Sequence, residues 1–206
     1  CLLTISALPA QNMDSLWSVW HDTTQVDTNR LKAVNDIIQN TIFNNPDSAD
    51  KLSSEMISLS NDKSLIKYHL IGLKFKGMAL YFKGFFDEAL EIFEIGLEKS
   101  YNKKTKTNFL MSLANVYQQS GKNMSMALTY YEEILDLIVI TDTIEEEELL
   151  MRSGVIMNIG LIYKKMGNFK VALKNYQHYV STNKKYNNDK FIHSAFLNIG
   201  NIYKKM

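Results

Sequence analysis

Residues 158–166 read NIGLIYKKM, and residues 198–206 repeat them as NIGNIYKKM. Eight of the nine positions are identical, and the two copies lie 40 residues apart. Self-similarity at a fixed period of about 20 to 50 residues is typical of repeat architectures, in which each unit packs against its neighbours along the chain. The two copies therefore predict a tandem array of short structural units.

The same pattern of small and aromatic residues extends toward the N-terminus. A small residue recurs within a helical pattern, a glycine follows after seven residues, an alanine after twelve or thirteen, and an aromatic residue four positions later. The recurring small residues are Gly77, Ala114, Gly160 and Gly200, and the glycines that follow are Gly84, Gly121 and Gly167. The alanines are Ala89, Ala127 and Ala172, and the aromatic residues are Phe93, Tyr131 and Tyr176. Small residues allow helices to cross closely, and glycine favours the left-handed conformation that ends many helices. The pattern predicts pairs of packed helices, with Asp87 placed to cap the second helix of its pair.

This order of residues resembles the tetratricopeptide repeat, most closely from Gly77 to Leu97, where residues 86–90 read FDEAL. The resemblance implies an all-α fold, an α-solenoid of tandem helix-turn-helix repeats wound into a right-handed superhelix. The spacing of about 40 residues exceeds the usual 34 or so of the family and implies helices about one turn longer.

A less regular first unit precedes these sets. Residues 29–42 predict one helix, and Pro46 and Asp47 predict the start of the next. The apolar faces of the two helices comprise Leu31, Val34, Ile37, Ile38 and Ile42, then Ala49, Leu52 and Met56. About 4.5 units result, over residues 29–69, 70–106, 107–152, 153–192 and 193–206, after a lead-in segment over 11–28. Solenoids end in polar capping helices, so we expect that the array was cut within its fifth unit.

Residues 1–10 are apolar and uncharged, and polar Gln11 and Asn12 follow. They indicate the remnant of a signal peptide with a cleavage site near Ala10, and so an exported protein on the periplasmic or extracytoplasmic side of a bacterial membrane. A short buried strand or helix start is the alternative, and a lipoprotein role for Cys1 lacks the residues that would precede it. No stretch has the roughly 20 apolar residues of a membrane span.

Composition and motifs argue against several functional classes. Formal charge is +1, from 23 basic and 22 acidic residues, which gives no overall field to recruit nucleic acid or an anionic membrane. The lone Cys1 excludes disulfide frameworks, and the four histidines, His21, His69, His178 and His193, are too isolated to form a metal cluster. No nucleophile elbow, phosphate-binding glycine loop or dinucleotide fingerprint is present. We expect no cofactor, no metal and no catalytic activity.

An acidic run at Glu145 to Glu148 follows Thr143 and predicts a capped helix start, since carboxylates favour the N-terminal end of a helix. An acidic binding patch is the alternative interpretation of this run.

Binding of a protein or peptide, or self-association, is the use that the resemblance implies. The concave face of such a solenoid is lined mainly by the first helix of each unit. By register with the family, the groove candidates are Lys74, Met78, Tyr81 and Phe82; Met111, Asn115, Gln118 and Gln119; Met157, Leu161, Lys164 and Lys165; and Leu197, Asn201, Lys204 and Lys205. Family members that grip C-terminal carboxylates pair Lys with Asn, and Met78 after Lys74 does not support a full clamp. The paired lysines at 164–165 and 204–205 can also be read as solvated residues that complement a helix end.

Residues 14–31, with Trp17 and Trp20, resemble the start of the exported N-terminal repeat regions of bacterial signalling proteins such as sensor histidine kinases and adenylate cyclases. The resemblance implies the extracytoplasmic sensor region of a larger membrane-anchored protein, whose missing C-terminal part could be a kinase or cyclase. A free periplasmic scaffold or assembly protein without an output domain is the alternative. The two tryptophans could also serve only to cover the first helix pair.

Overall fold

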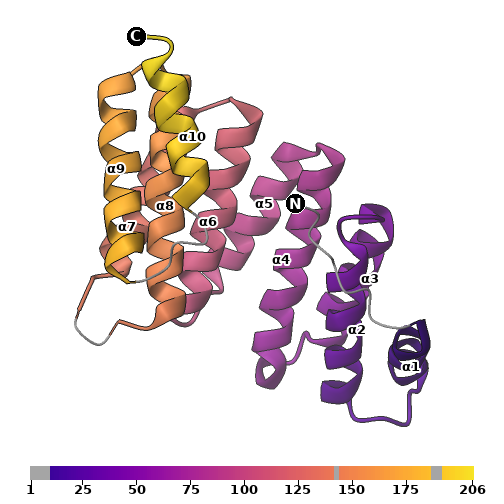
Figure 1. Ribbon diagram of the computed structural model, residues 1–206. Helices are drawn as coiled ribbons and strands as arrows, with labels where there is room; N and C mark the ends of the chain where they lie inside the picture. Colours follow the sequence, from indigo (N-terminus) through magenta and orange to yellow (C-terminus); the bar gives the residue numbers. More distant parts are fainter. Residues whose placement is uncertain (1–9, 142–143, 187–191) are drawn as a thin grey trace. The chain divides into compact units, whose positions relative to one another are not determined.

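The computed structural model describes residues 10–141, 144–186 and 192–206, and within these ranges the chain is helical, without strands (Figure 1). The all-α prediction is confirmed. The helices are α1 (Ala10–His21), α2 (Asp27–Thr41), α3 (Pro46–Leu59), the 3-10 turn η1 (Lys63–Leu65), α4 (Ile66–Lys83), α5 (Phe86–Glu98), α6 (Lys103–Ser120), α7 (Met124–Leu137), α8 (Glu146–Lys165), α9 (Phe169–Lys185) and α10 (Ile192–Tyr203).

The chain forms two compact units, residues 1–109 and 110–206. In the first unit α1 packs on α2, α2 on α3, α3 on α4 and α4 on α5; in the second, α7 packs on α8, α8 on α9 and α9 on α10 (Figure 1). Within each unit these helices thus pack on the next one along the chain, as expected of a helical repeat array. The right-handed winding stays a prediction.

Glycine ends the first helix of three pairs, as the spacing predicted. Gly84, Gly121 and Gly167 have φ angles of 84°, 69° and 77°, in the left-handed region. Because an L side chain is strained in this region, glycine is the residue that ends a helix there at least cost.

Asparagine starts the second helix of three pairs, a feature that the sequence analysis missed. The side-chain oxygens of Asn45, Asn123 and Asn168 accept hydrogen bonds from backbone amides three residues later, at 3.0, 3.1 and 3.3 Å. The prediction that Asp87 caps α5 is wrong, because α5 begins at Phe86 and no side chain bonds from the capping position at Phe85. Asp87 lies instead in the first turn, where its charge favours the helix dipole.

Small residues lie where helices cross, which confirms the prediction for two glycines. A Cβ added at Gly77 would lie 2.3 Å from the Phe93 ring, and one at Gly160 would lie 2.7 Å from the Tyr176 ring. Gly96 of α5 was not singled out, and a Cβ there would lie 2.1 Å from the ring of Phe109. Each aromatic ring therefore occupies the space that the missing side chain leaves.

The predicted apolar face of the first unit is buried. Leu31, Val34, Ile37, Ile38, Ile42, Ala49, Leu52 and Met56 form one core. Trp20 is buried in the same core and Trp17 packs against it, so both tryptophans contribute to covering the α2–α3 pair.

Two features of the sequence touch residues outside the described ranges. Residues 1–9 of the predicted signal peptide lie there, and so does Thr143, the expected cap of the acidic helix start. Glu146, Glu147 and Glu148 do form the first turn of α8, with Glu145 at the capping position and no side-chain cap bond. None of the helices in the described part of the chain has the length and apolar character needed to cross a membrane.

Candidate functional site

The first unit has a hollow of about 390 Å³ between α2 and α4. Amide side chains from α2 and apolar side chains from both helices surround it. The lining residues are Asn35, Gln39, Ile42, Phe43, Ile71, Lys74, Phe75 and Met78.

A second hollow, of about 220 Å³, lies between α4 and the start of α6. Leu70, Ile71 and Phe109 are its apolar residues, and lysines, amides and a hydroxyl provide its polar groups: Lys67, Lys74, Lys104, Asn102, Thr105 and Asn108, with Tyr101 beside them. Ile71 and Lys74 line both hollows. The two hollows therefore adjoin across α4, and we call their combined surface the α2–α4–α6 strip.

Lys74 lies at the junction of the two hollows and is only partly exposed. Burial lowers the pKa of its ammonium group, and the charge of Lys104 lowers it further. A charged lysine is thus held in a partly desolvated position near a second positive charge. An anionic group placed between the two lysines would offset this cost. Its negative charge would attract the ammonium group of Lys74, which burial has partly removed from water.

The remaining candidates of the first unit divide between the strip and an aromatic cluster. Met78 lines the first hollow, as predicted for a groove residue. Tyr81 and Phe82 instead form a ring cluster at the end of α4, with centroids 5.3 Å apart; Phe82 lies 5.2 Å from Phe43, and Tyr81 lies 5.8 Å from Phe86. Only Phe82 of the two is strongly exposed.

The candidates on α6 include two amides that face the interior of the second unit. The hydroxyl of Tyr131, a fully buried ring, lies 2.7 Å from Asn115 Oδ1 and 2.7 Å from Gln118 Oε1. The backbone oxygen of Gln118 also accepts a hydrogen bond from Lys165 Nζ at 3.2 Å. Met111 is partly buried and Gln119 is exposed. Asn115 and Gln118 thus hold α6 to α7, whatever else they bind.

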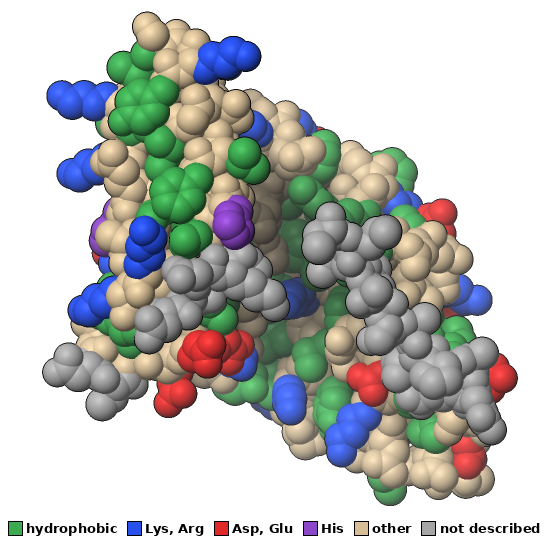
Figure 2. Space-filling view, in the orientation of Figure 1, with side chains coloured by type: hydrophobic (Ala, Val, Ile, Leu, Met, Phe, Trp, Pro, Cys, Tyr) green, Lys and Arg blue, Asp and Glu red, His purple; other side chains and the backbone are tan. Residues whose placement is uncertain are grey.

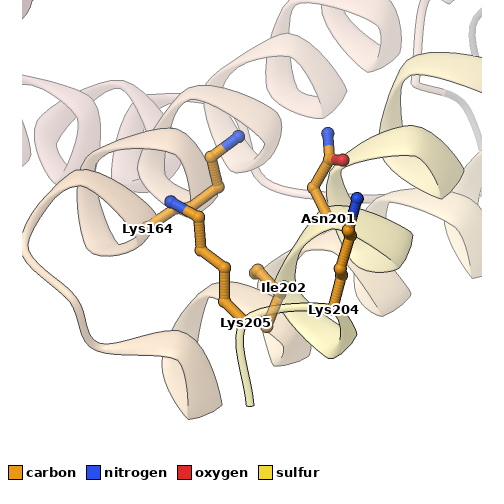
Figure 3. A pocket seen from close by; sticks show the side chains of 5 residues that line it. All are labelled: Lys164, Asn201, Ile202, Lys204 and Lys205. Carbon is orange, nitrogen blue, oxygen red and sulfur yellow. The ribbon is translucent and has the colours of Figure 1, made fainter.

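The candidates on α8 and α10 meet at a third hollow, of about 410 Å³ (Figure 3). Lys164, Asn201, Ile202, Lys204 and Lys205 line it, so four of the predicted residues are brought together. Lys164 Nζ donates a hydrogen bond to Asn198 Oδ1. Lys204 and Lys205 directly follow the last residue of α10, where positive charge also complements the helix dipole.

The other candidates of the second unit do not share one surface. Met157 and Leu161 pack against the core formed by α8, α9 and α10. Leu197 is 70% exposed and points away from that core.

Several residues of the strip were missed by the sequence analysis. Lys67 and Ile71 precede Lys74 by seven and three positions, on the same face of α4. Extending the predicted face of α4 by two turns toward its N-terminus finds both residues, and the same register in α2 gives Asn35 and Gln39. The same extension from Met111 of α6 gives Lys104 and Asn108, which precede it by seven and three positions.

A metal site is not supported in the described ranges, where no group of three His, Cys, Asp or Glu residues is placed to hold an ion.

Comparison with known proteins supports the repeat. Residues 154–186, which contain most of α8 and all of α9, match the family model described as tetratricopeptide repeat. Among solved structures, the crystal structure of BtubC (BKLC) from P. vanneervenii is similar, with a TM-score of 0.73 over 95% of this chain and 80% of that chain. Sequence identity is 16%, so this likeness concerns the fold alone. No curated protein matches the chain significantly. The findings support a tetratricopeptide-repeat protein, and such repeats indicate a protein–protein interaction module.

Proposed function

We propose that this protein binds an extended peptide of a partner protein along the α2–α4–α6 strip. The observation that carries the proposal is the pair of adjoining hollows that share Ile71 and Lys74. Three successive first helices contribute to this surface, which is the arrangement expected of a groove in a helical repeat array.

The side chains of the strip suit a peptide that carries both apolar and acidic groups. Asn35 and Gln39 carry amides, which can donate and accept hydrogen bonds with an extended backbone. Ile71, Phe75 and Met78 offer apolar contact to alternate side chains of such a peptide. Lys74, near Lys104, offers an ammonium group to a carboxylate.

A binding assay with defined peptides tests this proposal. Short extended peptides that combine Glu with Leu, and matched peptides with Gln in place of Glu, are titrated against the full chain by fluorescence polarisation. We expect Lys74→Met to weaken binding of the Glu peptides about fivefold and to change binding of the Gln peptides little. Lys51→Met, at an exposed lysine of α3 outside the strip, is the matched control. Equal affinity of both peptide sets for the unaltered chain, or equal effects of the two substitutions, would reject the strip as an anion-accepting groove.

We further propose that this module is the extracytoplasmic sensor or interaction region of a larger membrane-anchored signalling protein and has no catalytic step of its own. The support is in the sequence: the apolar, uncharged residues 1–10 and the resemblance of residues 14–31 to exported repeat regions. A free periplasmic scaffold is the second candidate, because the same fold serves both roles.

The genomic reading frame around the sequence separates these two candidates. A basic segment with an initiator Met before Cys1 supports export. A membrane helix and a kinase or cyclase domain after Met206 support the sensor, whereas further repeats followed by a polar helix and a stop support the scaffold. An N-terminal extension that lacks a signal peptide would contradict both.

A further inference from the structure

The α2–α4–α6 strip continues past Met78 to an exposed pair of aromatic rings. Phe43 lies in the turn after α2 and Phe82 lies near the end of α4; their ring centroids are 5.2 Å apart and the rings are tilted by 58°. Phe43 is 71% exposed and Phe82 is 42% exposed. Phe43 also lines the hollow between α2 and α4. The exposed ring pair therefore borders the same surface as Lys74.

Two rows of side chains connect Lys74 with the ring pair. Within each row the residues are four positions apart, so they share one side of their helix. The rows are Lys74, Met78 and Phe82 on α4, and Asn35, Gln39 and Phe43 in and after α2. Because the two rings meet at the end of both rows, the rows run side by side, and Gln39 and Met78 occupy their middle.

The middle of the strip suits an extended peptide. The amide of Gln39, an exposed side chain, can donate and accept hydrogen bonds with a peptide backbone. An extended peptide has backbone groups that need such partners, whereas a helix satisfies them internally. Met78 offers flexible apolar contact. Figure 2 shows hydrophobic side chains exposed beside Lys and Arg side chains on the first unit.

The length of α4 sets the spacing that such a peptide needs. Phe82 follows Lys74 by eight positions, which is about 12 Å along the helix axis. An extended chain advances about 3.3 Å per residue, so four residues span about 13 Å. Its successive side chains point to opposite sides, so residues two and four positions apart face the same surface. A separation of four therefore fits both the distance and the side, whereas three or five turns one side chain away.

We propose that the strip prefers extended peptides in which an acidic residue meets Lys74 and an aromatic residue four positions away meets the Phe43–Phe82 pair. The residue midway between them faces Met78 and is apolar. This preference rests on the groove proposed above and names the peptide that fits it. An aromatic residue suits the pair because two tilted rings present both an edge and a face to a third ring.

A series of labelled peptides tests the spacing. Each contains one Glu, a Leu two positions away and a Phe three, four or five positions away from the Glu, with Ser elsewhere, and each is made in both chain directions. Binding to the full chain is measured by fluorescence polarisation. In the direction that binds more tightly, we expect the separation of four to bind about tenfold more tightly than three or five. Ala in place of Phe should remove this advantage.

Substitutions in the chain locate the aromatic contact. Phe43→Ala and Phe82→Ala should each weaken binding of the peptide with a separation of four about fivefold, and should leave binding of the Ala peptide unchanged. Both side chains are exposed, and Phe43 is the more exposed, so we expect the melting temperature to change little. Phe196→Ala is the matched control, because Phe196 is 46% exposed and lies in the other unit.

Three results would overturn the spacing preference. They are equal affinity at all three separations, an effect of Phe43→Ala that is as large on the Ala peptide as on the Phe peptide, and self-association of the unaltered chain in sedimentation that Phe43→Ala abolishes. If Lys74→Met still distinguishes Glu from Gln peptides in these cases, the groove stands and the spacing alone is wrong. If the unaltered chain does not distinguish Glu from Gln, the groove fails and the spacing preference fails with it.

Discussion

The same aromatic position recurs in three helix pairs with different polar surroundings. Phe93 has no hydroxyl, Tyr131 has two amide oxygens within 2.7 Å, and the Tyr176 hydroxyl is buried with no hydrogen-bond partner in the described part of the chain. Burial raises the pKa of Tyr176 to about 12. The difference follows from the preceding helix, where Asn115 and Gln118 correspond to Leu161 and Lys164.

Substituting phenylalanine for Tyr131 and for Tyr176 should therefore affect the free energy of unfolding in different ways. We expect Tyr131→Phe to lower the free energy of unfolding by about 1 kcal/mol, because a hydrogen bond is lost. Tyr176→Phe should leave it unchanged or raise it slightly, because an unsatisfied buried hydroxyl is removed. Urea unfolding followed by circular dichroism measures both. Equal losses for the two variants would mean that the Tyr176 hydroxyl has a partner.

The position of these rings was predictable from the sequence, whereas the direction of the amides was not. Spacing places an aromatic residue four positions after each alanine, and all three rings are buried. Asn115 and Gln118 lie on the face of α6 that the register predicts to line a groove, and there both amide oxygens lie 2.7 Å from the Tyr131 hydroxyl. Register identifies that face, but the side-chain rotamer decides which neighbour the amide meets.

Lys74 provides a prediction about pH. Its pKa is lowered in the folded state by burial and by Lys104, so the folded state loses this proton at lower pH than the unfolded state does. Stability should therefore rise with pH between the folded pKa and the unperturbed value of 10.5, and the charge is a cost below that window. We expect Lys74→Met to melt at the same or a higher temperature near neutral pH, and the advantage to shrink as the pH approaches about 10. Melting curves of both proteins over that range are the measurement. A variant that melts well below the unaltered chain at neutral pH would show that the Lys74 charge is stabilising.

At the scale of the elements, glycine is required at a helix end because of the backbone conformation there and not because a side chain would lack space. A Cβ added at Gly84 would meet no described atom within 4 Å, yet the φ angle of 84° is unfavourable for other residues. We expect Gly84→Ala to cost about 1 kcal/mol and Gly84→Asn less, because asparagine tolerates this conformation. Gly154→Ala, inside α8, should instead stabilise by about 0.5–1 kcal/mol. Chemical denaturation of the three variants tests the contrast, and a neutral Gly84→Ala would contradict it.

Arg152 joins two elements that are separated by a loop. From α8, its Nη1 donates to the backbone oxygens of Leu135 and Ile138 at the end of α7, both at 2.7 Å. A guanidinium group there satisfies carbonyls that have no partner within the helix and complements its negative end. We expect Arg152→Met to lower the free energy of unfolding by about 2–3 kcal/mol and Arg152→Lys to lower it less. Full stability of Arg152→Met in thermal and urea unfolding would count against this role.

The sequence predicted the presence and the ends of the helices better than the side chains that cap their N-termini. The glycines that end α4, α6 and α8 follow a fixed spacing, and α4 and α8 contain 18 and 20 residues, in keeping with the long period. The pattern that identifies the repeat consists of small and aromatic residues and does not include the capping residues Asn45, Asn123 and Asn168. Arg152 was missed because its partners are backbone atoms, which leave no trace in the spacing of side chains.

At the scale of the whole molecule, each compact unit has its own core, and stacking in chain order explains why both can be built from the same short pattern. Recurring small and aromatic positions specify contacts between neighbouring helices. These recurring positions do not indicate which partner binds, because the residues predicted to line the groove differ from one unit to the next. Met78, Asn115, Leu161 and Asn201 occupy one repeated position with four different environments.

The charge of the whole chain leads to a last prediction. With 23 basic and 22 acidic residues, the protein has no overall field, so any attraction of anions must be local, as around Lys74. Binding of an acidic peptide should weaken with salt to a small degree, as expected for one or two charge contacts. Duplex and single-stranded DNA should not bind even at low salt, because many phosphate contacts are needed there. Fluorescence polarisation with labelled oligonucleotides and Glu peptides, at salt concentrations from about 50 to 200 mM, compares the two. Tight DNA binding with a steep dependence on salt would show that basic residues gather into a larger surface than the α2–α4–α6 strip.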